Sequence, residues 1–505
     1  MSLPFTTSNL RPSHLLPIMN TSATTSWDNV RAAFKKIWGY DNFRFPQGEI
    51  IRSLLEKQDA LIVLPTGGGK SICFQLPALL QTGLTLIVSP LVALMENQVQ
   101  ELHQLKLPAA LLHSELPTHQ RRQTLQALER QQLRLLYLSP ETLLSTPVWE
   151  RLCQPHLKIN GLILDEAHCL VQWGDTFRPA YRRLGTVRPA LLKCKPAGTK
   201  ISIAAFTATA DPIAQQTIRN VLQLQQPKPF LISPYRQNLN LKIQTVWTPR
   251  GRRQRLLKFI QARQKQTGLV YVRSRRESEE LAEWLGSLGY TTAAYHAGLS
   301  PEERRAIEAS WLSGKSQFVV CTCAFGMGIN KPDVRWVVHY QSPQLLSEYI
   351  QEVGRGGRDG KPSDALTLVS EPTGWLNPED KQRREFFVDK MRSQYQDAQQ
   401  LVKKLPPQGD VATVAKQYRG GAIALALLDS AGQLEWQDPF HYRKLPSGKS
   451  QTLAQLSMTQ EKVQKQMTQY LNTRECRWQF LLKAFGFNQE AAGFRCENCD
   501  NCTRR

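Results

Sequence analysis

Short apolar runs that alternate with helical stretches constrain the fold of this 505-residue chain more than any other feature. They form two sets, separated by a segment with three prolines at 225–238. The first set comprises 61–64, 85–90, 134–140, 162–166 and 204–209, and the second comprises 269–274, 318–323, 336–340 and 365–370. Buried runs of this length between helices are typical of parallel sheets covered on both faces. The sequence therefore predicts two α/β domains in tandem, over 27–233 and 234–370.

The segments outside these two domains differ in composition. Residues 1–26 are rich in Ser, Thr and Pro and lack the apolar centre of a signal peptide, which predicts a disordered tail. After Glu371 the pattern is helical. We expect a helical segment over 371–404, a Pro- and Gly-bounded insert over 405–448 and a cysteine-bearing domain over 449–505. No apolar run reaches the roughly 18–20 residues needed to span a bilayer, so no membrane partner is expected.

Charge and cysteine usage narrow the kind of partner and the compartment. The chain carries 64 Lys and Arg against 42 Asp and Glu, a net charge of +22. An excess spread along the chain points to a polyanionic partner, most simply nucleic acid, with a merely soluble basic surface as the alternative. Six of the ten cysteines are scattered among apolar residues, as buried thiols in a reducing compartment would be. We therefore expect an intracellular protein, in the cytoplasm and nucleoid or, in a eukaryote, in the nucleus.

A glycine-rich turn, "LPTGGGKS" at 64–71, follows the first apolar run. The strict phosphate-loop signature requires Gly where this chain has Leu64, but the mechanism is preserved. Glycines let the backbone turn its N–H groups toward phosphate oxygens at a helix start. Lys70 can then reach the β- and γ-phosphates, and Ser71 can bind Mg²⁺. The predicted nucleotide-binding residues here are Thr66, Gly67, Gly68, Gly69, Lys70 and Ser71.

Two acids and a histidine end the run "LILDEAH" at 162–168. Asp165 would hold the Mg²⁺, and Glu166 would orient and polarise the attacking water. An acidic strand end that caps the next helix would explain one carboxylate but not this order of residues. His168 is either structural or couples the nucleotide to the neighbouring domain.

The second domain contributes two arginines in "YIQEVGRGGRDG" at 349–360. Arg355 and Arg358 are three residues apart, so they project from one side if the segment is helical. Arginines beside a γ-phosphate stabilise the charge that develops in phosphoryl transfer, whereas salt bridging on a solvated helix is the alternative. An ATP site between two such domains is typical of a motor, because hydrolysis changes how the domains close.

Four cysteines stand together near the end of the chain. Cys476 precedes Cys496 by 20 residues, and Cys499 and Cys502 follow at intervals of three. Four thiolates in this pattern suit tetrahedral Zn²⁺. An iron–sulfur cluster is the alternative, although the ferredoxin-type run needs a further Cys-Pro that this chain lacks; a site without metal is the third interpretation. Since four cysteines fill all positions around zinc, its role would be structural.

These motifs together resemble the RecQ family of superfamily-2 DNA helicases, over roughly 27–370 and again over 457–502. The segments that match its successive motifs include 39–51, 89–99, 135–143, 206–210, 295–304 and 321–340. The resemblance implies two RecA-like domains and an adenine site in which Gln47 reads the base edge, with Phe43 and Arg44 packing near it. It also implies that Thr207 and Thr209 couple ATP to DNA movement, and that Arg358 is the arginine finger.

The most specific match is "DEAHCLVQWGDTFRPAYRRL" at 165–184. Members of the family carry an aromatic-rich loop here that senses single-stranded DNA. Trp173 and Phe177 offer stacking surfaces for bases and Arg178 adds a cation, although an aromatic cluster that packs a domain edge is the alternative. The family pattern has His where this chain has Asp175, which should weaken the contact with phosphates. The predicted DNA-sensing residues are His168, Trp173, Phe177 and Arg178.

The resemblance also bears on the C-terminal region. The cysteines are similar to the zinc platform of the family, which is usually followed by a winged-helix domain, whereas only Thr503, Arg504 and Arg505 follow Cys502 here. Residues 410–445 read as helix, Gly-Gly turn, apolar helix and hairpin, a winged-helix order. The second helix is too apolar to read bases. The hairpin carries Trp436, Phe440, His441 and Tyr442, which could form a strand-separating wing; a simple helical insert is the alternative.

The sequence therefore predicts an ATP- and Mg²⁺-dependent DNA helicase with a structural zinc site. By resemblance it would travel 3′→5′, act in recombination or repair, and bind single-stranded and tailed duplex DNA as a monomer, with a single-stranded-DNA-binding protein as a candidate partner. Two alternatives remain: an RNA-directed helicase with the same motor, and a non-motor nucleic-acid-binding scaffold.

Overall fold

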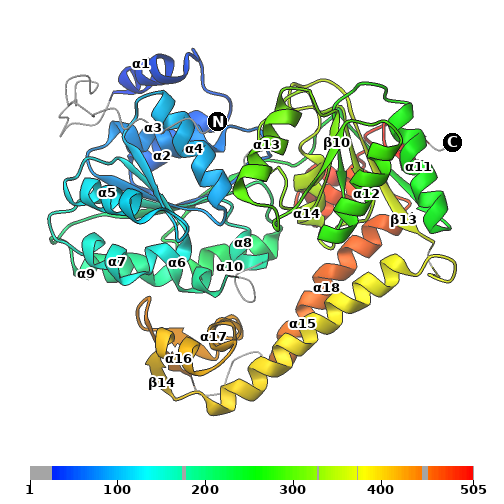
Figure 1. The fold of residues 1–505 in the computed structure, drawn as a ribbon. Helices are drawn as coiled ribbons and strands as arrows, with labels where there is room; N and C mark the ends of the chain where they lie inside the picture. Colours follow the sequence, from blue (N-terminus) through cyan, green and yellow to red (C-terminus); the bar gives the residue numbers. More distant parts are fainter. Residues whose placement is uncertain (1–25, 173–177, 327–328, 372, 446–452, 504–505) are drawn as a thin grey trace.

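Two parallel-sheet domains lie side by side, and a helical arm carries a small third unit beneath the first domain (Figure 1). This is a computed structural model, and it describes residues 26–172, 178–326, 329–371, 373–445 and 453–503. The tail expected over 1–26 lies, apart from Ser26, outside the described residues. No helix among the described residues is long and apolar enough to cross a membrane.

Domain 1 is built on a seven-stranded sheet in the order β3-β4-β2-β5-β6-β1-β7, in which every pair is parallel. Its strands are β1 (Ala60–Val63), β2 (Leu84–Val88), β3 (Ala109–Leu112), β4 (Leu135–Leu138), β5 (Ile159–Leu164), β6 (Ser202–Thr207) and β7 (Lys228–Leu231). Successive residues of β1 belong to opposite cores: Leu61 packs in one hydrophobic cluster and Ile62 in the other. The predicted sheet with two covered faces is confirmed.

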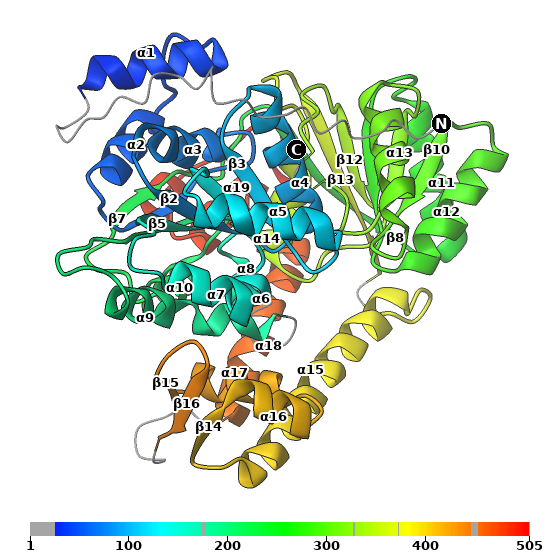
Figure 2. The same cartoon turned by 60° about the vertical axis from the view of Figure 1, so that its left-hand side comes forward.

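The helices of domain 1 lie on both faces of this sheet (Figure 2). They are α1 (Trp27–Trp38), α2 (Gln47–Leu55), α3 (Lys70–Leu80), α4 (Val92–Gln104), α5 (Thr118–Glu129), α6 (Pro140–Leu143), α7 (Thr146–Leu152), α8 (Cys169–Gln172), the 3-10 helix η2 (Pro179–Thr186), α9 (Val187–Lys193) and α10 (Pro212–Val221). Helix η2 is buried through Ala180, Tyr181 and Leu184, which belong to the same hydrophobic cluster as Leu61. It therefore forms a fixed surface directly after the aromatic-rich loop.

Domain 2 repeats this plan with six strands in the order β10-β11-β9-β12-β13-β8, again all parallel. The strands are β8 (Leu239–Val246), β9 (Gly268–Tyr271), β10 (Thr292–Tyr295), β11 (Phe318–Cys321), β12 (Trp336–His339) and β13 (Ser363–Ser370). The helices are α11 (Pro249–Gln261), α12 (Arg275–Ser287), α13 (Pro301–Leu312) and α14 (Leu346–Val353). Two hydrophobic clusters again flank the sheet.

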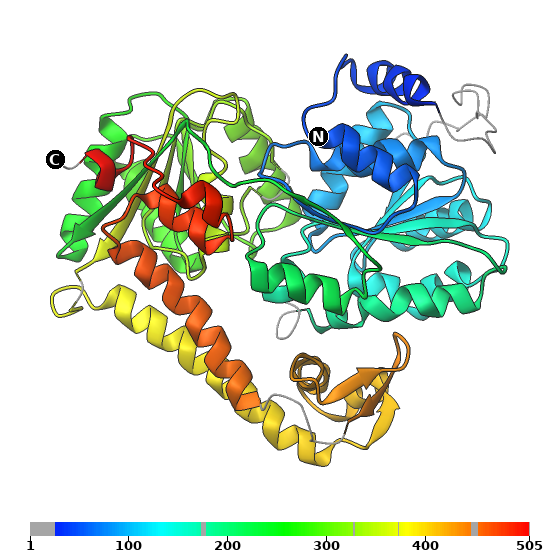
Figure 3. The same ribbon diagram turned by 180° about the vertical axis from the view of Figure 1, so that it is seen from behind.

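The region after domain 2 consists of a stalk, an insert and a cysteine module. Helices α15 (Glu379–Lys404) and α18 (Leu453–Asn472) lie side by side as the stalk (Figures 1 and 3). The insert between them contains β14 (Gln408–Asp410), α16 (Val411–Gln417), α17 (Gly421–Ser430), β15 (Leu434–Trp436) and β16 (His441–Lys444). Its sheet is antiparallel in the order β14-β16-β15. The cysteine module contains α19 (Arg477–Ala484), α20 (Asn488–Ala491) and α21 (Asp500–Thr503).

Candidate active site and metal centre

The glycine-rich turn lies between the end of β1 and the start of α3. Gly67 and Gly69 have φ angles of 84° and 72°, a left-handed conformation that glycine adopts without strain. Gly69 is the N-cap of α3, and Lys70 and Ser71 form its first turn. The free N–H groups of this helix start and the Lys70 ammonium make the turn suited to binding phosphate.

Gln47 lies directly over this turn. Its Nε2 donates to the carbonyl of Gly68 at 3.1 Å, and its Oε1 accepts from the backbone N–H of Arg44 at 2.9 Å. A Cβ at Gly69 would lie 2.3 Å from Gln47 Nε2, so a larger residue there would displace the Gln47 side chain from the turn. The structure thus brings the predicted adenine segment and the phosphate turn together.

The aromatic residues of the adenine segment divide into two roles. Phe43 packs against Phe34, with ring centroids 4.3 Å apart, inside the hydrophobic cluster around α1. Phe45 is 80 % exposed, and Arg44 is exposed beside it. The exposed ring next to Gln47 is therefore Phe45, which the sequence interpretation did not single out.

Asp165 and Glu166 follow the last residue of β5, at the carboxyl edge of the sheet where β1 delivers the phosphate turn. Asp165 is buried, and its Oδ2 accepts from Gln98 Nε2 at 3.2 Å while Oδ1 accepts from the Glu166 backbone N–H at 3.0 Å. Glu166 has a φ of 52°, which is uncommon for a residue with a side chain.

The pKa values of the two acids are shifted in opposite directions. Burial raises the pKa of Asp165 to about 6, aided by the neighbouring Glu166 charge and opposed by Lys70. Burial alone would also raise the pKa of Glu166, but the Lys70 charge, a hydrogen bond from His168 and the charges of His168 and Arg355 lower it to about 2. Glu166 therefore stays ionised to a lower pH than Asp165, because it lies in the field of cations from both domains.

His168 links this pair to the next strand. Its Nδ1 lies 3.3 Å from Glu166 Oε2 and 3.1 Å from Thr207 Oγ1. Since the Thr207 hydroxyl donates its proton to the carbonyl of Thr209, at 3.0 Å, the His168 Nδ1 must be the donor to Thr207. His168 is thus a buried connector between the acid pair and the Thr-Ala-Thr turn.

The connection continues across the domain boundary. Gln351 of α14 donates from Nε2 to Thr209 Oγ1 at 3.0 Å. A chain of polar contacts therefore runs from Glu166 through His168, Thr207 and Thr209 into domain 2. Gln351 lies inside the arginine-bearing segment at 349–360, four residues before Arg355, but its type alone gave no reason to select it.

Arg355 and Arg358 reach the same cleft from domain 2. Helix α14 ends at Val353, so both arginines lie in the turns that follow it, and the helical spacing considered from the sequence does not apply. Arg355 is buried and donates to the carbonyl of Gly326. Arg358 donates from Nη1 to the carbonyl of Ile329 at 2.9 Å, and a Cβ at Gly67 would lie 3.7 Å from its side-chain carbons. The side chain of Arg358 therefore reaches the phosphate turn of domain 1.

The arginine cluster is short of negative charge. Burial, together with the charges of Arg355 and Arg236, lowers the pKa of Arg358 to about 10. Three guanidinium groups held together in this way repel one another. A polyphosphate between the domains would neutralise them.

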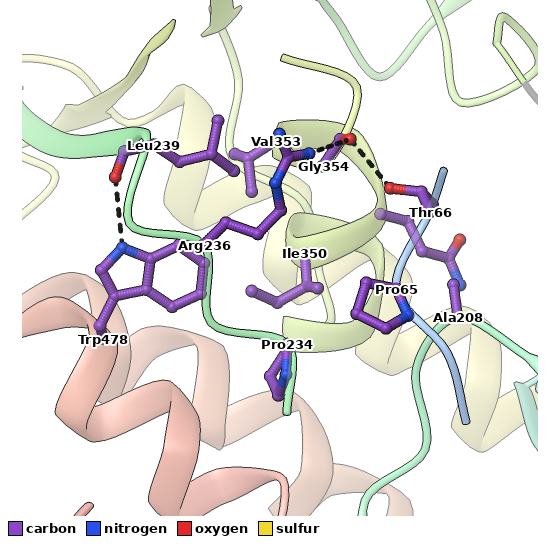
Figure 4. Close-up of a pocket in the computed structure, with 11 residues that line it drawn as sticks. Pro65, Thr66, Ala208, Pro234, Arg236, Leu239, Ile350, Val353, Gly354 and Trp478 are labelled. Carbon is purple, nitrogen blue, oxygen red and sulfur yellow. Dashed lines mark hydrogen bonds between the residues drawn. The ribbon is translucent and has the colours of Figure 1, made fainter. Parts of the chain in front are cut away.

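Next to these groups the domains are in close contact (Figure 4). Thr66 Oγ1 donates to the carbonyl of Gly354 at 2.8 Å, and Arg236 donates to the same carbonyl at 3.1 Å. The cavity that they line has a volume of about 10 Å³, room for no more than one water. Thr66 therefore joins the phosphate turn to the glycine-rich turn of domain 2.

The predicted DNA-sensing loop is only partly described. Trp173, Asp175 and Phe177 lie outside the described residues. Arg178 makes an ion pair with Glu141, with 2.9 Å between Nη1 and Oε2, and η2 follows it directly. His168, at the start of the loop, is in the acid-pair network described above.

The four C-terminal cysteines form a compact cluster. Their Sγ atoms all lie within 4.8 Å of one another. A zinc ion with Zn–S bonds of about 2.3 Å requires sulfurs about 3.8 Å apart, so small shifts would complete a tetrahedron. Hydrogen bonds from the thiols of Cys496 and Cys499 lower the pKa of Cys476. The predicted zinc ligands Cys476, Cys496, Cys499 and Cys502 are brought together.

This cluster is fixed to the edge of the domain 2 sheet. Asp500 pairs with Arg477, with 2.9 Å between Oδ1 and Nε, and its Oδ2 accepts from the backbone N–H of Ile243 in β8 at 3.1 Å. Trp478 donates from its indole nitrogen to the carbonyl of Leu239 at 3.2 Å. The cysteine module is therefore part of domain 2 rather than a separate unit.

Fold and site together define a two-domain, ATP-hydrolysing helicase motor. A family model described as DEAD/DEAH box helicase matches residues 45–217, and one described as helicase conserved C-terminal domain matches 251–360. A third, described as RecQ zinc-binding, matches 436–503.

Individual relatives show which family of helicases the chain belongs to. The chain is 52% identical to the ATP-dependent DNA helicase RecQ of Synechocystis sp., over 94% of this chain and 98% of that protein. It is 38% identical to RecQ of Haemophilus influenzae, over 70% of this chain and 56% of that protein, and 39% identical to ATP-dependent DNA helicase Q5 of Mus musculus, over 66% and 35%. The chain belongs to the RecQ family of ATP-dependent DNA helicases, and it uses ATP and Zn²⁺.

Solved structures agree with the fold. Dbp5 of S. cerevisiae bound to RNA and ADP BeF3 matches with a TM-score of 0.55 and 17% identity, over 70% of this chain and 91% of that one. The helicase Lhr of Mycobacterium smegmatis bound to ssDNA and AMP-PNP matches with a TM-score of 0.56 and 19% identity, over 88% and 61%. At this identity the likeness establishes the two-domain architecture.

Proposed function

We propose that this RecQ-family helicase moves 3′→5′ along single-stranded DNA and unwinds tailed duplexes in recombination or repair. One observation supports a motor above the others. The acid pair that faces ATP is connected to α14 of domain 2 through His168, Thr207, Thr209 and Gln351. A change at the nucleotide is thereby transmitted to the relative position of the domains.

The residues of the cleft take separate roles in hydrolysis. Lys70 and the N–H groups of the glycine-rich turn bind the phosphates, and Gln47 recognises the adenine edge with Arg44 beside it. Glu166 orients the attacking water, and Arg358 stabilises the charge that develops on the γ-phosphate, with Arg355 behind it. Mg²⁺, held by Asp165 and Ser71, would neutralise phosphate charge.

The charges around the acid pair suggest how ATP acts on Glu166. Lys70 is the largest of the influences that lower the pKa of Glu166. When the phosphates take up the Lys70 charge, the pKa of Glu166 rises from about 2. Phosphate bound at Lys70 therefore changes the charge that Glu166 experiences.

One gel tests polarity and substrate. Duplexes with a 3′ tail, a 5′ tail, a fork or blunt ends are incubated with and without ATP. We expect ATP-dependent strand displacement from the 3′-tailed and forked duplexes, and none from the 5′-tailed or blunt ones. Displacement from the 5′-tailed duplex alone would overturn the assigned polarity. RNA of the same sequence, used as ATPase activator, separates a DNA-directed from an RNA-directed motor.

Lys70→Ala tests whether the ATP site drives unwinding. We expect ATPase and strand displacement to be abolished, because the phosphates lose their principal cation, while DNA binding stays within about threefold of wild type. Unwinding that persists at the wild-type rate would contradict the motor. Gln216→Ala, an exposed change on α10, serves as the control.

Trp173→Ala tests the aromatic-rich loop. Stacking of a base on an aromatic ring contributes about 1–3 kcal/mol. We therefore expect the DNA-stimulated ATPase to fall at least fivefold and the basal ATPase to change by less than twofold. An equal fall in both would make Trp173 a packing residue.

Two further assignments complete the proposal. The protein acts as a monomer inside the cell, on chromosomal DNA that a single-stranded-DNA-binding protein covers. Light scattering of the purified chain at working concentration measures the first, and a pull-down with the purified single-strand-binding protein measures the second. A stable dimer, or no retention above background, would remove the corresponding assignment.

A further inference from the structure

The insert between the stalk helices is attached to both motor domains. It is carried by domain 2 through α15 and α18, yet it lies beneath domain 1 (Figures 1 and 2). Its contacts with domain 1 include η2 and α7. The insert therefore adds a connection between the two domains, besides the chain around 233–238 and the contacts at the nucleotide cleft.

The stalk gives the insert a rigid base. At its domain 2 end, Asp380 of α15 pairs with the buried Arg252 of α11, with 2.8 Å between Oδ2 and Nη2. At its other end the insert shares a hydrophobic cluster with both stalk helices. That cluster contains Tyr395, Ala398, Ala424, Leu427, Ala431 and Leu453. The insert cannot turn freely on the stalk because its apolar helix α17 is packed into it.

The contact with domain 1 is specific and largely buried. Asp429 of α17 pairs with Arg182 of η2, with 2.7 Å between Oδ2 and Nε, and the two side chains are 17% and 8% exposed. Arg183 donates from Nη1 to the carbonyl of Pro439 at 2.8 Å. The Phe440 ring stands edge-on to Trp149 of α7, with centroids 5.3 Å apart. We call these three contacts the insert bridge.

The tip of the hairpin packs on domain 1 rather than on the rest of the insert. Phe440 packs against the hydrophobic core of domain 1, whereas Trp436 and Tyr442 pack in the core of the insert itself. Of the four aromatic side chains suggested by the sequence for a strand-separating wing, His441 alone is exposed. In this arrangement the tip of the hairpin docks on domain 1 through Phe440, so that ring is not available to separate base pairs.

We propose that the insert is an intramolecular brace: it uses α17 and the hairpin to bind domain 1 and so holds the two motor domains near their ATP-binding arrangement. Arg182 and Asp429 are positioning residues that act through the domain geometry and do not touch nucleotide. The inference goes beyond the proposed function, and it requires neither a direction of travel nor unwinding.

The brace affects nucleotide binding through effective concentration. Arg358 of domain 2 completes the site for ATP bound to domain 1. An arginine that is held near the site binds ATP better than one on a domain that moves freely. Loss of the insert bridge should therefore raise the KM for ATP and leave kcat nearly unchanged, because the catalytic groups themselves are intact. The insert bridge also involves η2, which directly follows the predicted DNA-sensing loop. DNA bound at that loop would therefore act on the insert through η2.

The test uses the full chain with Asp429→Asn, which keeps the shape of the side chain but leaves Arg182 without its carboxylate. Hydrogen exchange, without ATP or DNA, is expected to be at least tenfold faster in 179–186 and in the hairpin residues 437–441. The KM for ATP is expected to rise at least threefold. Glu435→Gln is the matched control, since it removes an exposed ion pair of the hairpin with Arg443 and leaves the bridge intact.

Two further variants keep the proposal falsifiable if Asp429→Asn weakens the insert. Phe440→Ala removes a side chain that packs on domain 1 rather than in the insert core, and should shift exchange and KM in the same direction. Arg182→Gln combined with Asp429→Asn should be no worse than either change alone, because both act on one contact. Unchanged exchange in Asp429→Asn and Phe440→Ala would refute the brace, and faster exchange at an unchanged KM would refute its control of ATP binding. Unwinding is measured separately, so failure of the proposed polarity leaves this result interpretable.

Discussion

Two of the contacts between the motor domains, one at the nucleotide cleft and one at the insert, are made by different kinds of interaction. At the cleft, two hydrogen bonds between neutral groups cross the domain boundary: Thr66 donates to the carbonyl of Gly354, and Gln351 donates to Thr209. We call this pair the nucleotide bridge. The insert bridge instead combines a buried ion pair with aromatic packing.

This difference decides which contact can change during a cycle of hydrolysis. A neutral hydrogen bond contributes about 0.5–1.5 kcal/mol net, so ATP can replace the nucleotide bridge at little cost. Removal of one partner from a buried ion pair costs about 3–5 kcal/mol. The nucleotide bridge is therefore suited to form and break, and the insert bridge to persist as the point about which the domains move.

Removal of zinc should have the largest effect, because the insert bridge depends on the cysteine module. Arg477 of that module donates from Nη1 to the carbonyl of Tyr470 at the end of α18, at 2.6 Å. Structural zinc contributes about 10 kcal/mol or more to the folding of small metal domains. We expect chelation, or Cys499→Ser, to unfold 470–503, free the stalk and abolish unwinding.

The measurement is zinc release followed by hydrogen exchange and the unwinding gel. Zinc added back should restore both in the chelated wild type but not in Cys499→Ser. Unwinding that continues after one equivalent of zinc has left the protein would show that the stalk does not need the module.

Arg358→Ala should have the next largest effect and should act on the cleft alone. An arginine that stabilises the phosphoryl-transfer transition state contributes about 10³–10⁵ in kcat. We expect kcat to fall by about 10³ in a steady-state ATPase assay, with exchange in η2 unchanged because the insert bridge is intact. Arg276→Gln, which removes an exposed charge from α12 of the same domain, is the control. A fall of less than tenfold would assign the transition-state role to Arg355.

The sequence predicted the centre of each sheet and missed its borders. Nine apolar runs correspond to the inner strands, whereas β3, β7, β8 and β10 were not recognised. These four strands are the edges of the two sheets. An edge strand is covered on fewer sides, so its sequence is not continuously apolar: β7 reads "KPFL" and exposes Lys228, Pro229 and Leu231.

A similar limit applies to the sites. The phosphate turn and the metal cluster were predictable because few other residues can perform their chemistry. Glycines before a lysine indicate phosphate binding, and four regularly spaced cysteines indicate metal binding. Asp429 and Arg182 are ordinary helix residues 247 positions apart, and nothing in their spacing indicates that they meet. Gln351 was missed for the same reason, since its importance comes from Thr209 in another domain.

Gln351→Ala should have the smallest effect, and it separates coupling from hydrolysis. The variant removes one neutral hydrogen bond of the nucleotide bridge, worth about 1 kcal/mol, which corresponds to about fivefold in a rate. We expect the DNA-stimulated kcat to fall about fivefold, because the network from Glu166 to domain 2 is cut, while basal ATPase and the KM for ATP change by less than twofold. Gln216→Ala, which removes an exposed hydrogen bond within domain 1, is the matched control. If basal and DNA-stimulated rates fall together, Gln351 supports catalysis directly. If KM rises instead, the nucleotide bridge shares the holding role assigned to the insert bridge.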